Sequence, residues 1–405
     1  MMEIGPIFRA LTRNKLGALL IALQIALTLA IVTNAAFIIR ERAADIARPS
    51  GLDEANTAIF ITTLFDSKVD QRQLIRDDLD KLRSLPGVIA ASPTQSIPIS
   101  GSGWGESLYN DPALPSNESI NFGNFMVDEQ GLEAFGLELV AGRNFRADEI
   151  MVRSMEINAE PTQLVISQAL ADELFPDGNA LGQTVWDEPN GEKPMEIIGI
   201  YSHMQNAWPG SSNVNNTALM PLLGMFGGRM MYVVRTEPGQ LEQVMTATEE
   251  YLSKNRSRIV DVVRSYQEQK QRTYQRDIAM VKLLSAVIVV LTGVTALGIV
   301  GLAWFSVTQR RKQIGTRRAL GATRFDIVRY FMLENGLITS FGLVLGMIGA
   351  VGLNWFLDTQ YSVGRVPLWY LPIGMLVLWV LGQLAVLLPA RRAANIPPAM
   401  ATRSV

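Results

Sequence analysis

The side chains that most often carry chemistry are almost missing from this chain. Its 405 residues include no cysteine and a single histidine, His203. Without cysteine there are no disulfides, thiolate zinc sites, iron–sulfur clusters or thiol catalysis, and one histidine leaves almost nothing for a Ser-His-Asp triad. The motif G-x-x-x-x-G-K-[ST], which cradles nucleotide phosphates, does not occur either. We therefore expect no catalytic, metal-binding or cofactor-binding residues and no ATP binding through a P-loop.

One glycine-rich run, Ser100–Gly105 (SGSGWG), has a composition that could approach a ligand. It does not lie between a strand and a helix, as a dinucleotide-binding loop would. Its glycine and serine content favours a flexible loop. The alternative is a loop that contacts cargo or a partner protein, because exposed tryptophan such as Trp104 is favoured at interfaces. His203, in a polar loop, is interpreted as a surface side chain rather than a ligand.

The most informative pattern lies between Gln309 and Glu334, where basic and apolar residues alternate at helical spacing. It predicts a basic amphipathic helix that joins two membrane spans. The basic residues are Arg310, Arg311, Lys312, Arg317, Arg318, Arg324 and Arg329, against one acid, Asp326. The apolar residues that need burial are Ile314, Leu320, Phe325, Ile327 and Val328. Such a helix either rests on anionic lipid headgroups or binds another protein through its apolar face.

Four charge-free apolar runs supply the elements that must position this segment. They are Leu16–Ile39, Leu283–Gln309, Asn335–Leu357 and Val366–Ala390. A helix needs about 20 apolar residues to cross the ~30 Å hydrocarbon layer, so each run is long enough. The first is too long for a signal peptide, and no A-x-A-like cleavage site follows it. Two other uncharged runs, Ser84–Gly105 and Met204–Gly228, are rich in Pro, Gly, Ser and Asn and are interpreted as loops of a soluble domain.

Charge is strongly segregated along the chain. Residues 40–278 hold 21 basic and 34 acidic side chains, a net of −13, whereas the remainder holds 15 basic and 4 acidic, a net of +11. The overall charge of −2 excludes a generally basic nucleic-acid binder. Basic residues favour the cytoplasmic side, which predicts cytoplasmic termini and an outer 40–278 block. The predicted segments are a cytoplasmic N-terminus at 1–15, span one at 16–39, the outer domain at 40–278, span two at 279–308, a cytoplasmic segment at 309–330, span three at 331–357, a short outer loop at 358–366, span four at 367–390 and a cytoplasmic tail at 391–405.

The spans carry no acidic or basic residue near mid-bilayer. A charge there usually marks an ion or proton pathway, so its absence argues against a transporter that works through an intramembrane carboxylate. Glu334 and Lys282 lie at span edges, where snorkelling to the interface explains them. A stripe of small residues on span three predicts close helix packing, either within the chain or in a dimer. Its members are Gly342, Gly346 and Gly349.

The outer block contains two similar strand–helix–strand patterns. The first comprises Ala58–Leu64, Arg72–Leu85 and Val88–Ala91, and the second comprises Met230–Val234, a helix marked by Leu241 to Leu252, and Ile259–Val263. Two such units separated by a long insert predict a split, ferredoxin-like α+β sandwich, with residues about 93–228 inserted as a mostly β lobe. Within the insert, strands are predicted at Leu164–Ile166 and Met195–Ile200, and a helix at Gln168–Leu174.

Several of these segments carry a family resemblance. Arg311–Thr323 closely resembles the R-x-x-E-I-G-x-R-R-A-L-G-A-T signature of the MacB/FtsX superfamily of ABC transporter permeases. Gly136–Phe145, Val165–Val185 and Glu196–Ile200 resemble the MacB-type periplasmic core domain, and Pro389–Ala394 (PARRAA) resembles the family's ending after its last span. Two departures are Gln313, where the signature has Glu, and Ile396-Pro397-Pro398 in place of an acidic D-P ending. The first departure bears on any ATPase contact that the missing carboxylate would make.

The resemblance implies a dimer of four-span permeases, paired with a second copy or a related permease and powered by a cytosolic ABC ATPase that alone binds ATP. Because only fifteen residues precede span one, we expect that ATPase to be a separate polypeptide. The outer domain would hold the family's Porter and Sabre parts, and stalk extensions of spans one and two would transmit force. The residues implied in ATPase coupling are Arg311, Ile314, Gly315, Arg317, Arg318, Leu320, Gly321 and Phe325.

Three functions follow from the resemblance. The first is export of a peptide, antibiotic, siderophore or similar cargo from the periplasm, with a periplasmic adaptor protein and an outer-membrane channel as partners. The second is an FtsX-like mechanotransmitter that controls a periplasmic hydrolase, and the third is release of lipoproteins. A large outer domain with MacB-like motifs favours the first. The expected location is the bacterial inner membrane, crossed several times.

Overall fold

The computed structural model describes residues 15–397 apart from 67, 116–117, 155–156, 158 and 188–191. The predicted cytoplasmic N-terminus, except its last residue, and residues 398–405 of the predicted tail lie outside the described residues. The described chain forms two compact units. The helical unit holds the described residues up to Ile46 and from Asp277 onward, and the α/β unit is Ala47–Arg276.

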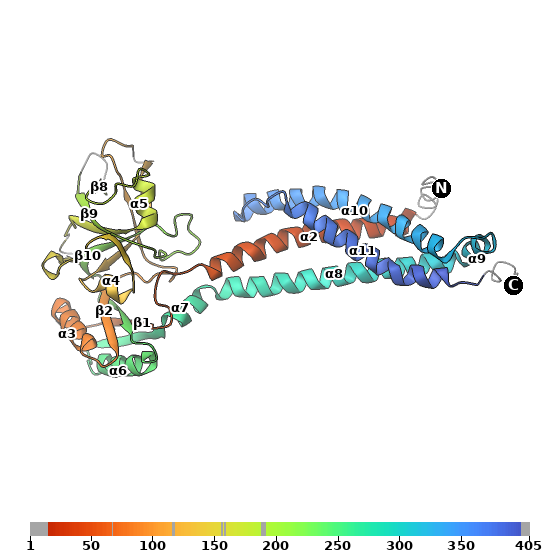
Figure 1. The fold of residues 1–405 in the computed structure, drawn as a ribbon. Helices are drawn as coiled ribbons and strands as arrows, with labels where there is room; N and C mark the ends of the chain where they lie inside the picture. The colour runs from red at the N-terminus through yellow and green to blue at the C-terminus, as the bar shows by residue number, and fades with distance from the viewer. Residues whose placement is uncertain are drawn as a thin grey trace. The chain divides into compact units, whose positions relative to one another are not determined.

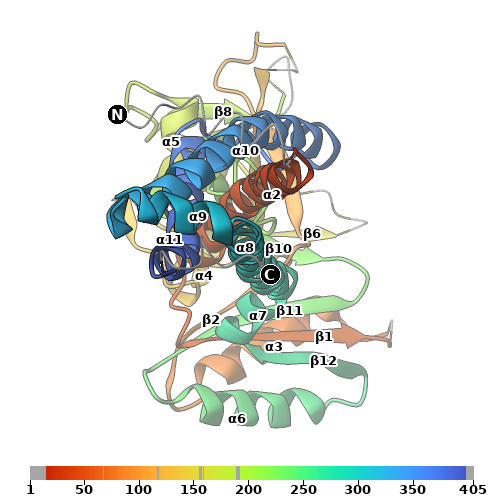
Figure 2. The same cartoon turned by 90° about the vertical axis from the view of Figure 1, so that its right-hand side faces the viewer.

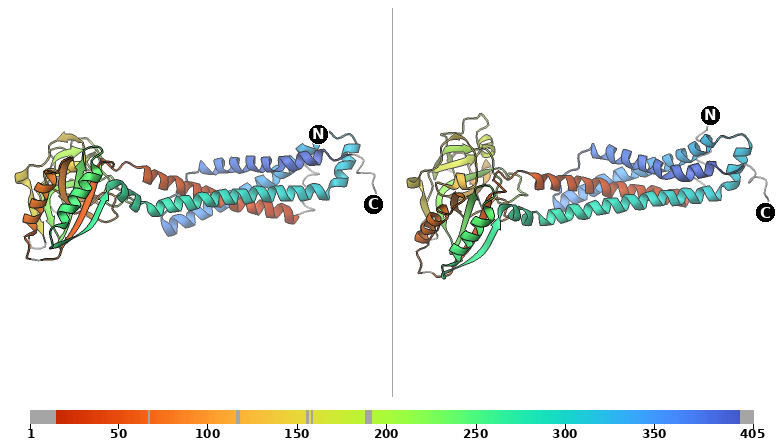
Figure 3. Two further views of the ribbon diagram at one scale, coloured as in Figure 1. Left: turned by 90° about the horizontal axis from the view of Figure 1, so that it is seen from below. Right: turned by 60° about the horizontal axis from the view of Figure 1, so that its bottom comes forward.

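The helical unit contains four long apolar helices and one short one. They are α2 (Lys15–Ala47), α8 (Gln275–Gln309), α9 (Arg311–Ala319), α10 (Arg324–Tyr361) and α11 (Tyr370–Ala394). By length and composition, all but α9 are able to cross a membrane. This result confirms the predicted fold class on the membrane side. At 1.5 Å per residue α2 and α8 are about 50 Å long, well beyond the ~30 Å hydrocarbon layer, and they run side by side (Figure 1, Figure 3).

Helix α10 extends into the predicted loops on both sides of span three. It begins at Arg324, where Thr323 and Asp326 form a capping box, and ends at Tyr361, after which Ser362 has a left-handed φ of 51°. Charged residues beyond the hydrocarbon do not end a helix, since its backbone hydrogen bonds are made within the helix. The prediction of one continuous helix at 309–334 is wrong for a related reason: the segment is α9, a turn, and the first turns of α10.

The small-residue stripe on α10 lies against α2 of the same chain. A Cβ at Gly342 would come within 2.7 Å of the Ala22 carbonyl oxygen, and one at Gly346 within 2.9 Å of the Ala26 Cα. Those distances are too short for any side chain, so the two backbones approach each other closely. At Gly349 the nearest atom would be 3.5 Å away, an ordinary contact.

The α/β unit is built on a four-stranded antiparallel sheet in the order β12-β1-β11-β2 (Figure 2). Its elements are β1 (Thr57–Leu64), α3 (Gln71–Arg83), β2 (Val88–Thr94), β11 (Arg229–Thr236), α6 (Leu241–Ser253) and β12 (Arg258–Ser265). Two strand–helix–strand halves thus share one sheet. Strand β11 of the second half lies between β1 and β2 of the first half, and β12 lies on the other side of β1. The predicted split ferredoxin-like sandwich is confirmed.

The insert between β2 and β11 is a mixed sheet with short helices. Its strands are β3 (Trp104–Leu108), β4 (Ile120–Val127), β5 (Leu139–Gly142), β6 (Met151–Ser154), β7 (Gln163–Ser167), β8 (Thr184–Trp186), β9 (Pro194–Tyr201) and β10 (Thr217–Met225). Its helices are α4 (Gly131–Ala134), the 3-10 turn η2 (Ala147–Glu149) and α5 (Gln168–Leu174). The main path runs β3-β4-β10-β7-β9-β5, with β6 on β10 and β8 on β9. The predicted strands at 164–166 and 195–200 and the helix at 168–174 are present.

The interpretation of Met204–Gly228 as a loop is wrong, because β10 lies inside it. This strand pairs with β4 and β6 in parallel and with β7 antiparallel. Its residues from Thr217 to Leu223 are all buried. A strand covered on both faces shows no apolar–polar alternation, and its proline and glycine made the run look like a loop.

A buried ion pair joins the two halves of the sandwich. The guanidinium of Arg258, at the start of β12, binds both carboxylate oxygens of Asp78 on α3, and the Nη2–Oδ1 distance is 2.9 Å. Both side chains are essentially inaccessible to solvent. The hydroxyl of Tyr232 on β11 donates to the same carboxylate at 2.6 Å. Burial and the adjacent Asp78 hold the pKa of Tyr232 well above its usual value, so the phenol keeps its proton as the donor.

We expect Arg258→Met to destabilise the α/β unit strongly, because it leaves the Asp78 carboxylate buried without its cation. Such a loss costs roughly 3–5 kcal/mol, which lowers the melting temperature of a unit this size by roughly 6–20 °C. Differential scanning fluorimetry of the full chain in detergent measures the shift. Arg256→Gln, an exposed arginine two residues earlier, is the control and should melt like the parent. Equal melting of the two variants would contradict a structural role for the pair.

Candidate functional site

The connection between α8 and α10 is a compact hairpin. Leu320 caps α9, and Gly321 has a φ of 98°, a left-handed conformation that favours glycine. The N–H groups of Gly321 and Ala322 donate to the carbonyls of Arg318 and Arg317 at 3.2 and 3.0 Å, which closes the end of α9. The chain then reverses into α10 (Figure 1). Gly321 therefore forms the sharp turn between α9 and α10.

An ion pair holds the base of this hairpin. Arg310, between α8 and α9, places Nη1 2.9 and 2.8 Å from the two carboxylate oxygens of Glu334 on α10 and 3.4 Å from the Tyr330 hydroxyl. The side chains of Arg310 and Glu334 are only 15% and 11% exposed. The interpretation of Glu334 as a snorkelling side chain is therefore wrong. Its carboxylate is turned inward to a specific cation, which is the more favourable arrangement for a partly buried acid.

The apolar face of α9 is covered by the chain itself. Ile314 is buried in a cluster that includes Ile327 and Phe331 of α10 and Ala393 of α11. The guanidinium of Arg317 lies over the ring of Tyr330, 4.6 Å from its centroid, in cation–π geometry. The expectation that Ile314 and Ile327 need an external partner is wrong, because α9 folds back onto α10.

The implied coupling residues therefore divide into two groups. The inward group stabilises the hairpin: Ile314 and Gly315 are buried, and Arg318 donates to the Ala322 carbonyl at 3.4 Å. The outward group consists of exposed residues, namely Arg311, Arg317, Leu320, Gly321 and Phe325. Leu320 is 83% and Phe325 70% exposed, which is unusual for large apolar side chains outside a lipid-facing helix. We call Leu320, Gly321 and Phe325 the exposed tip.

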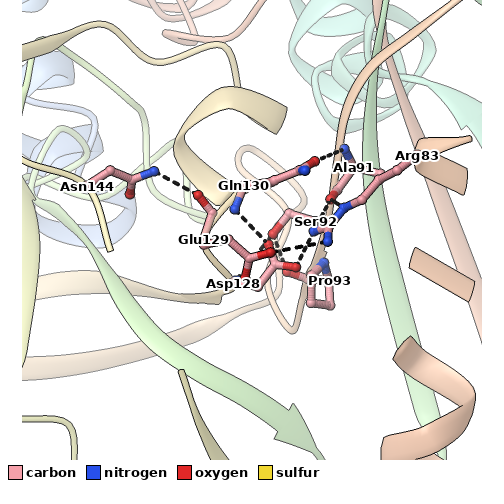
Figure 4. Close-up of polar contacts among 8 residues, drawn as sticks. All are labelled: Arg83, Ala91, Ser92, Pro93, Asp128, Glu129, Gln130 and Asn144. Carbon is pink, nitrogen blue, oxygen red and sulfur yellow. Dashed lines mark hydrogen bonds and ion pairs between the residues drawn. The ribbon is translucent and has the colours of Figure 1, made fainter. Parts of the chain in front are cut away.

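A second polar cluster joins the sandwich to its insert, and we call it the lobe junction (Figure 4). Arg83 at the end of α3 donates through Nε and Nη2 to the Ala91 carbonyl at 3.0 and 2.8 Å. The same guanidinium binds the carboxylate of Asp128 after β4 and reaches that of Glu129 at 3.3 Å. The side-chain oxygen of Gln130 accepts from the Ala91 N–H at 3.3 Å. One arginine thus links both lobes.

Asp128 is the unusual member of the lobe junction. Burial raises the pKa of its carboxyl to about 6, although Arg83 and the Ser92 hydroxyl favour the charged form. By contrast, the half-buried carboxyl of Glu149 has a pKa of about 2, because it is held mainly by hydrogen bonds from Arg143 and from the Arg146 N–H. A carboxyl with a raised pKa binds its proton more tightly when folded, so it lowers stability as pH rises from about 4 towards 6.

We expect Asp128→Asn to remove this pH dependence. In the parent, the Asp128 contribution declines by about 2 kcal/mol between pH 4 and pH 7, since the folded and unfolded pKa values differ by about two. Loss of the Arg83 partner also changes the free energy of unfolding of the variant, by an amount that does not depend on pH. The stability of the variant relative to the parent should therefore increase with pH, as denaturant unfolding at a series of pH values would measure. A constant difference would show that Asp128 titrates normally.

Sequence reasoning missed the residues that hold these sites in place. Arg310 and Glu334 are 24 positions apart, and Arg83 and Asp128 are 45 apart. The only signal for the first pair was an isolated acid at the edge of an apolar run. No pattern marked Asp128, because a single carboxylate after a strand is common in loops.

Two family models match the chain. The MacB-like periplasmic core domain matches residues 18–251, and the FtsX-like permease C-terminal matches residues 285–398. The first covers more than half of the chain and includes most of α2 and most of the α/β unit. The second covers most of α8 and then α9, α10 and α11, together with the hairpin and its exposed tip.

Similar proteins carry related descriptions. The macrolide export ATP-binding/permease protein MacB of Vibrio parahaemolyticus is 26% identical over 351 residues, which are 81% of this chain and 48% of that protein. An uncharacterized ABC transporter permease, YvrN of Bacillus subtilis, is 25% identical over 68% of this chain and 69% of its own length. The chain thus spans about half the length of the MacB relatives that it matches. Among solved structures, the periplasmic region of MacB from Actinobacillus actinomycetemcomitans aligns with 56% of this chain and 96% of its own, with 16% identity and a TM-score of 0.34.

Proposed function

The chain belongs to the MacB-like and FtsX-like family of ABC transporter permeases, and we propose that it couples ATP hydrolysis by a partner ATPase to conformational change in its α/β unit. This multi-pass membrane protein would be the permease subunit of an exporter for a peptide, an antibiotic or a similar cargo. ATP would be bound by the partner, since the 405-residue sequence contains no P-loop motif. Support for a separate permease subunit comes from the Bacillus subtilis relative, which is itself described as a permease.

The observation that carries this proposal is the exposed tip on a braced hairpin. An ATPase stroke can move a membrane helix only if the contacted element is rigidly joined to that helix. The Arg310–Glu334 ion pair and the buried Ile314 make α9 one body with α10. Phe325 and Leu320 then project as apolar anchors. Buried aromatic anchors typically dominate the energy of protein interfaces.

The proposed topology places the hairpin in the cytoplasm and the α/β unit in the periplasm. The distribution of basic and acidic residues supports this orientation. A second copy of the chain, or a related permease, would lie against α8, in which Leu283, Val289 and Leu297 are more than 60% exposed. A periplasmic adaptor and an outer-membrane channel would complete the export path.

Export is preferred over mechanotransmission to a periplasmic hydrolase or release of lipoproteins. The MacB-like match extends through the insert to residue 251, whereas the FtsX-like match is confined to residues 285–398. The elaborated part of the chain therefore resembles the MacB-like relatives, described as macrolide export proteins.

We expect Phe325→Ala to weaken binding of the ATPase by roughly 30- to 1,000-fold, the effect of losing an interface anchor worth ~2–4 kcal/mol. The measurement is co-purification of the ATPase with the tagged chain, together with stimulated ATP hydrolysis in lipid nanodiscs. Phe305→Ala removes an equally large exposed ring from α8 and should change neither.

Arg317→Gln tests the alternative that the hairpin rests on lipid. If the hairpin binds the ATPase, Arg317→Gln should weaken ATPase binding only slightly and in a way that depends on salt concentration, because a charge at the rim of an interface contributes little. If the hairpin only rests on anionic headgroups, each lost positive charge should weaken its binding to the membrane surface more than loss of the Phe325 ring does. Normal ATPase binding by both Phe325→Ala and Arg317→Gln would rule out coupling through this hairpin.

The absence of natural cysteine allows a direct test of topology. Single substitutions Ser253→Cys at the end of α6 and Thr316→Cys on α9 place thiols at exposed positions. A membrane-impermeant maleimide should label the first in spheroplasts and the second only after lysis. The reverse pattern would invert the proposed orientation, and labelling of both before lysis would disprove it.

A further inference from the structure

One cleft in the α/β unit has no part in the proposed force transmission. It lies over one face of the four-stranded sheet, and α3 and α6 pack on the opposite face. Side chains on β1 alternate, so Phe60 packs in the core under these helices, whereas Ile59 and Ile61 line the cleft. Met231 of β11 and Val262 of β12 complete an apolar floor. The cleft encloses about 360 Å³, the lower end of the range for small-molecule sites.

The glycine-rich run of the sequence forms one wall of this cleft. Ser100, Ser102 and Gly103 line it, and Trp104 opens β3 beside them. The Trp104 ring stacks on Phe226, with 5.0 Å between ring centroids and 28° between planes. It is nevertheless 44% exposed. A flat aromatic surface is therefore available at the edge of the apolar floor.

The cleft is basic, whereas the segment that contains it is acidic. Arg229 of β11 and Arg264 of β12 line it, and none of its described lining residues carries a carboxylate. Residues 40–278 have a net charge of −13. Arg264 donates from Nη1 to the side-chain oxygen of Gln269 at 2.5 Å, a neutral partner. Burial and the nearby Arg272 lower the pKa of Arg264, although Glu268 opposes this effect.

Gln95 also lines the cleft. Its side-chain oxygen accepts from the Met126 N–H at 2.7 Å, which orients the amide. Its Nε2 is buried and has no hydrogen-bond partner among the described residues. Buried donors are nearly always paired in folded proteins, so this amide is unusual among the side chains that line the cleft.

From this arrangement we propose that the cleft binds a small amphipathic anion, with its aromatic or alkyl group between Trp104 and the sheet face and its acid group on Arg229 and Arg264. This inference goes beyond the proposed function, because force transmission requires no such ligand. Gln269 belongs to α7 (Tyr266–Thr273), which only Tyr274 separates from α8 in sequence. A bound anion would therefore contact the segment that leads into a membrane helix.

Isothermal titration calorimetry with 2-naphthalenesulfonate tests the proposal on the full chain in nanodiscs of phosphatidylcholine, with empty nanodiscs subtracted. The neutral 2-naphthalenesulfonamide has the same ring system without the charge. We expect the sulfonate to bind about tenfold or more tightly than the sulfonamide, and less tightly at high salt. Absence of sulfonate binding at about 1 mM, or equal affinity for both probes, would overturn the proposal.

Variants locate the site. Arg229→Gln and Arg264→Gln should each weaken sulfonate binding about tenfold, and Trp104→Ala should weaken it roughly fivefold. Arg256→Gln, an exposed arginine outside the cleft lining, should bind like the parent. Arg229 is exposed, so its substitution keeps the test valid if Arg264→Gln melts early. If Arg229→Gln and Trp104→Ala both bind normally, the probe binds elsewhere and the assignment is wrong. The ATPase takes no part in this measurement, so failure of the coupling proposal would leave its result unchanged.

Discussion

The α/β unit depends on the buried contact between Asp78, Arg258 and Tyr232. Its two strand–helix–strand halves are separated by the insert between β2 and β11, so local sequence cannot hold them together. Asp78 belongs to the first half, while Arg258 and Tyr232 belong to the second. An ion pair removed from water is stable only when its remaining hydrogen-bonding capacity is filled, and the tyrosine hydroxyl supplies that bond. The Asp78 carboxylate therefore gains these hydrogen bonds only when the two halves form one sheet.

The same device recurs at two other contacts between distant segments. Arg83 joins the sandwich to the insert through Asp128 and Glu129, and Arg310 joins α9 to α10 through Glu334. In each case a guanidinium contacts carboxylates from another element, and its planar set of donors fixes direction as well as distance. The basic cleft differs in this respect. Arg264 there has a neutral side-chain partner, Gln269, which is the reason the cleft suits an external anion.

The hairpin between α8 and α10 shows how one motif serves two purposes. Side chains that match the family signature include Ile314, which is buried in the hairpin, and Leu320, which is exposed at its tip. A rigid base and an apolar tip are both required for an element that would transmit a push, because a flexible base would absorb the movement. Substitutions in the two groups should therefore fail differently, one through folding and the other through binding.

The sequence by itself determined the four long apolar helices and the two halves of the sandwich, because both follow from local patterns. Apolar length is sufficient to indicate a membrane helix, and period-2 and period-3.6 spacing marked the strands and helices of each half. Tertiary structure alone decided the rest. The central strand β10 lacks alternation because both of its faces are buried. Local pattern suggested that Ile314 was free to bind a partner, but it is buried where α9 packs against α10. It also suggested that Glu334 was solvated, but Arg310, 24 residues earlier, lies 2.9 Å from its carboxylate. Burial and ion pairing depend on which distant segments meet, and that information is not carried by local spacing.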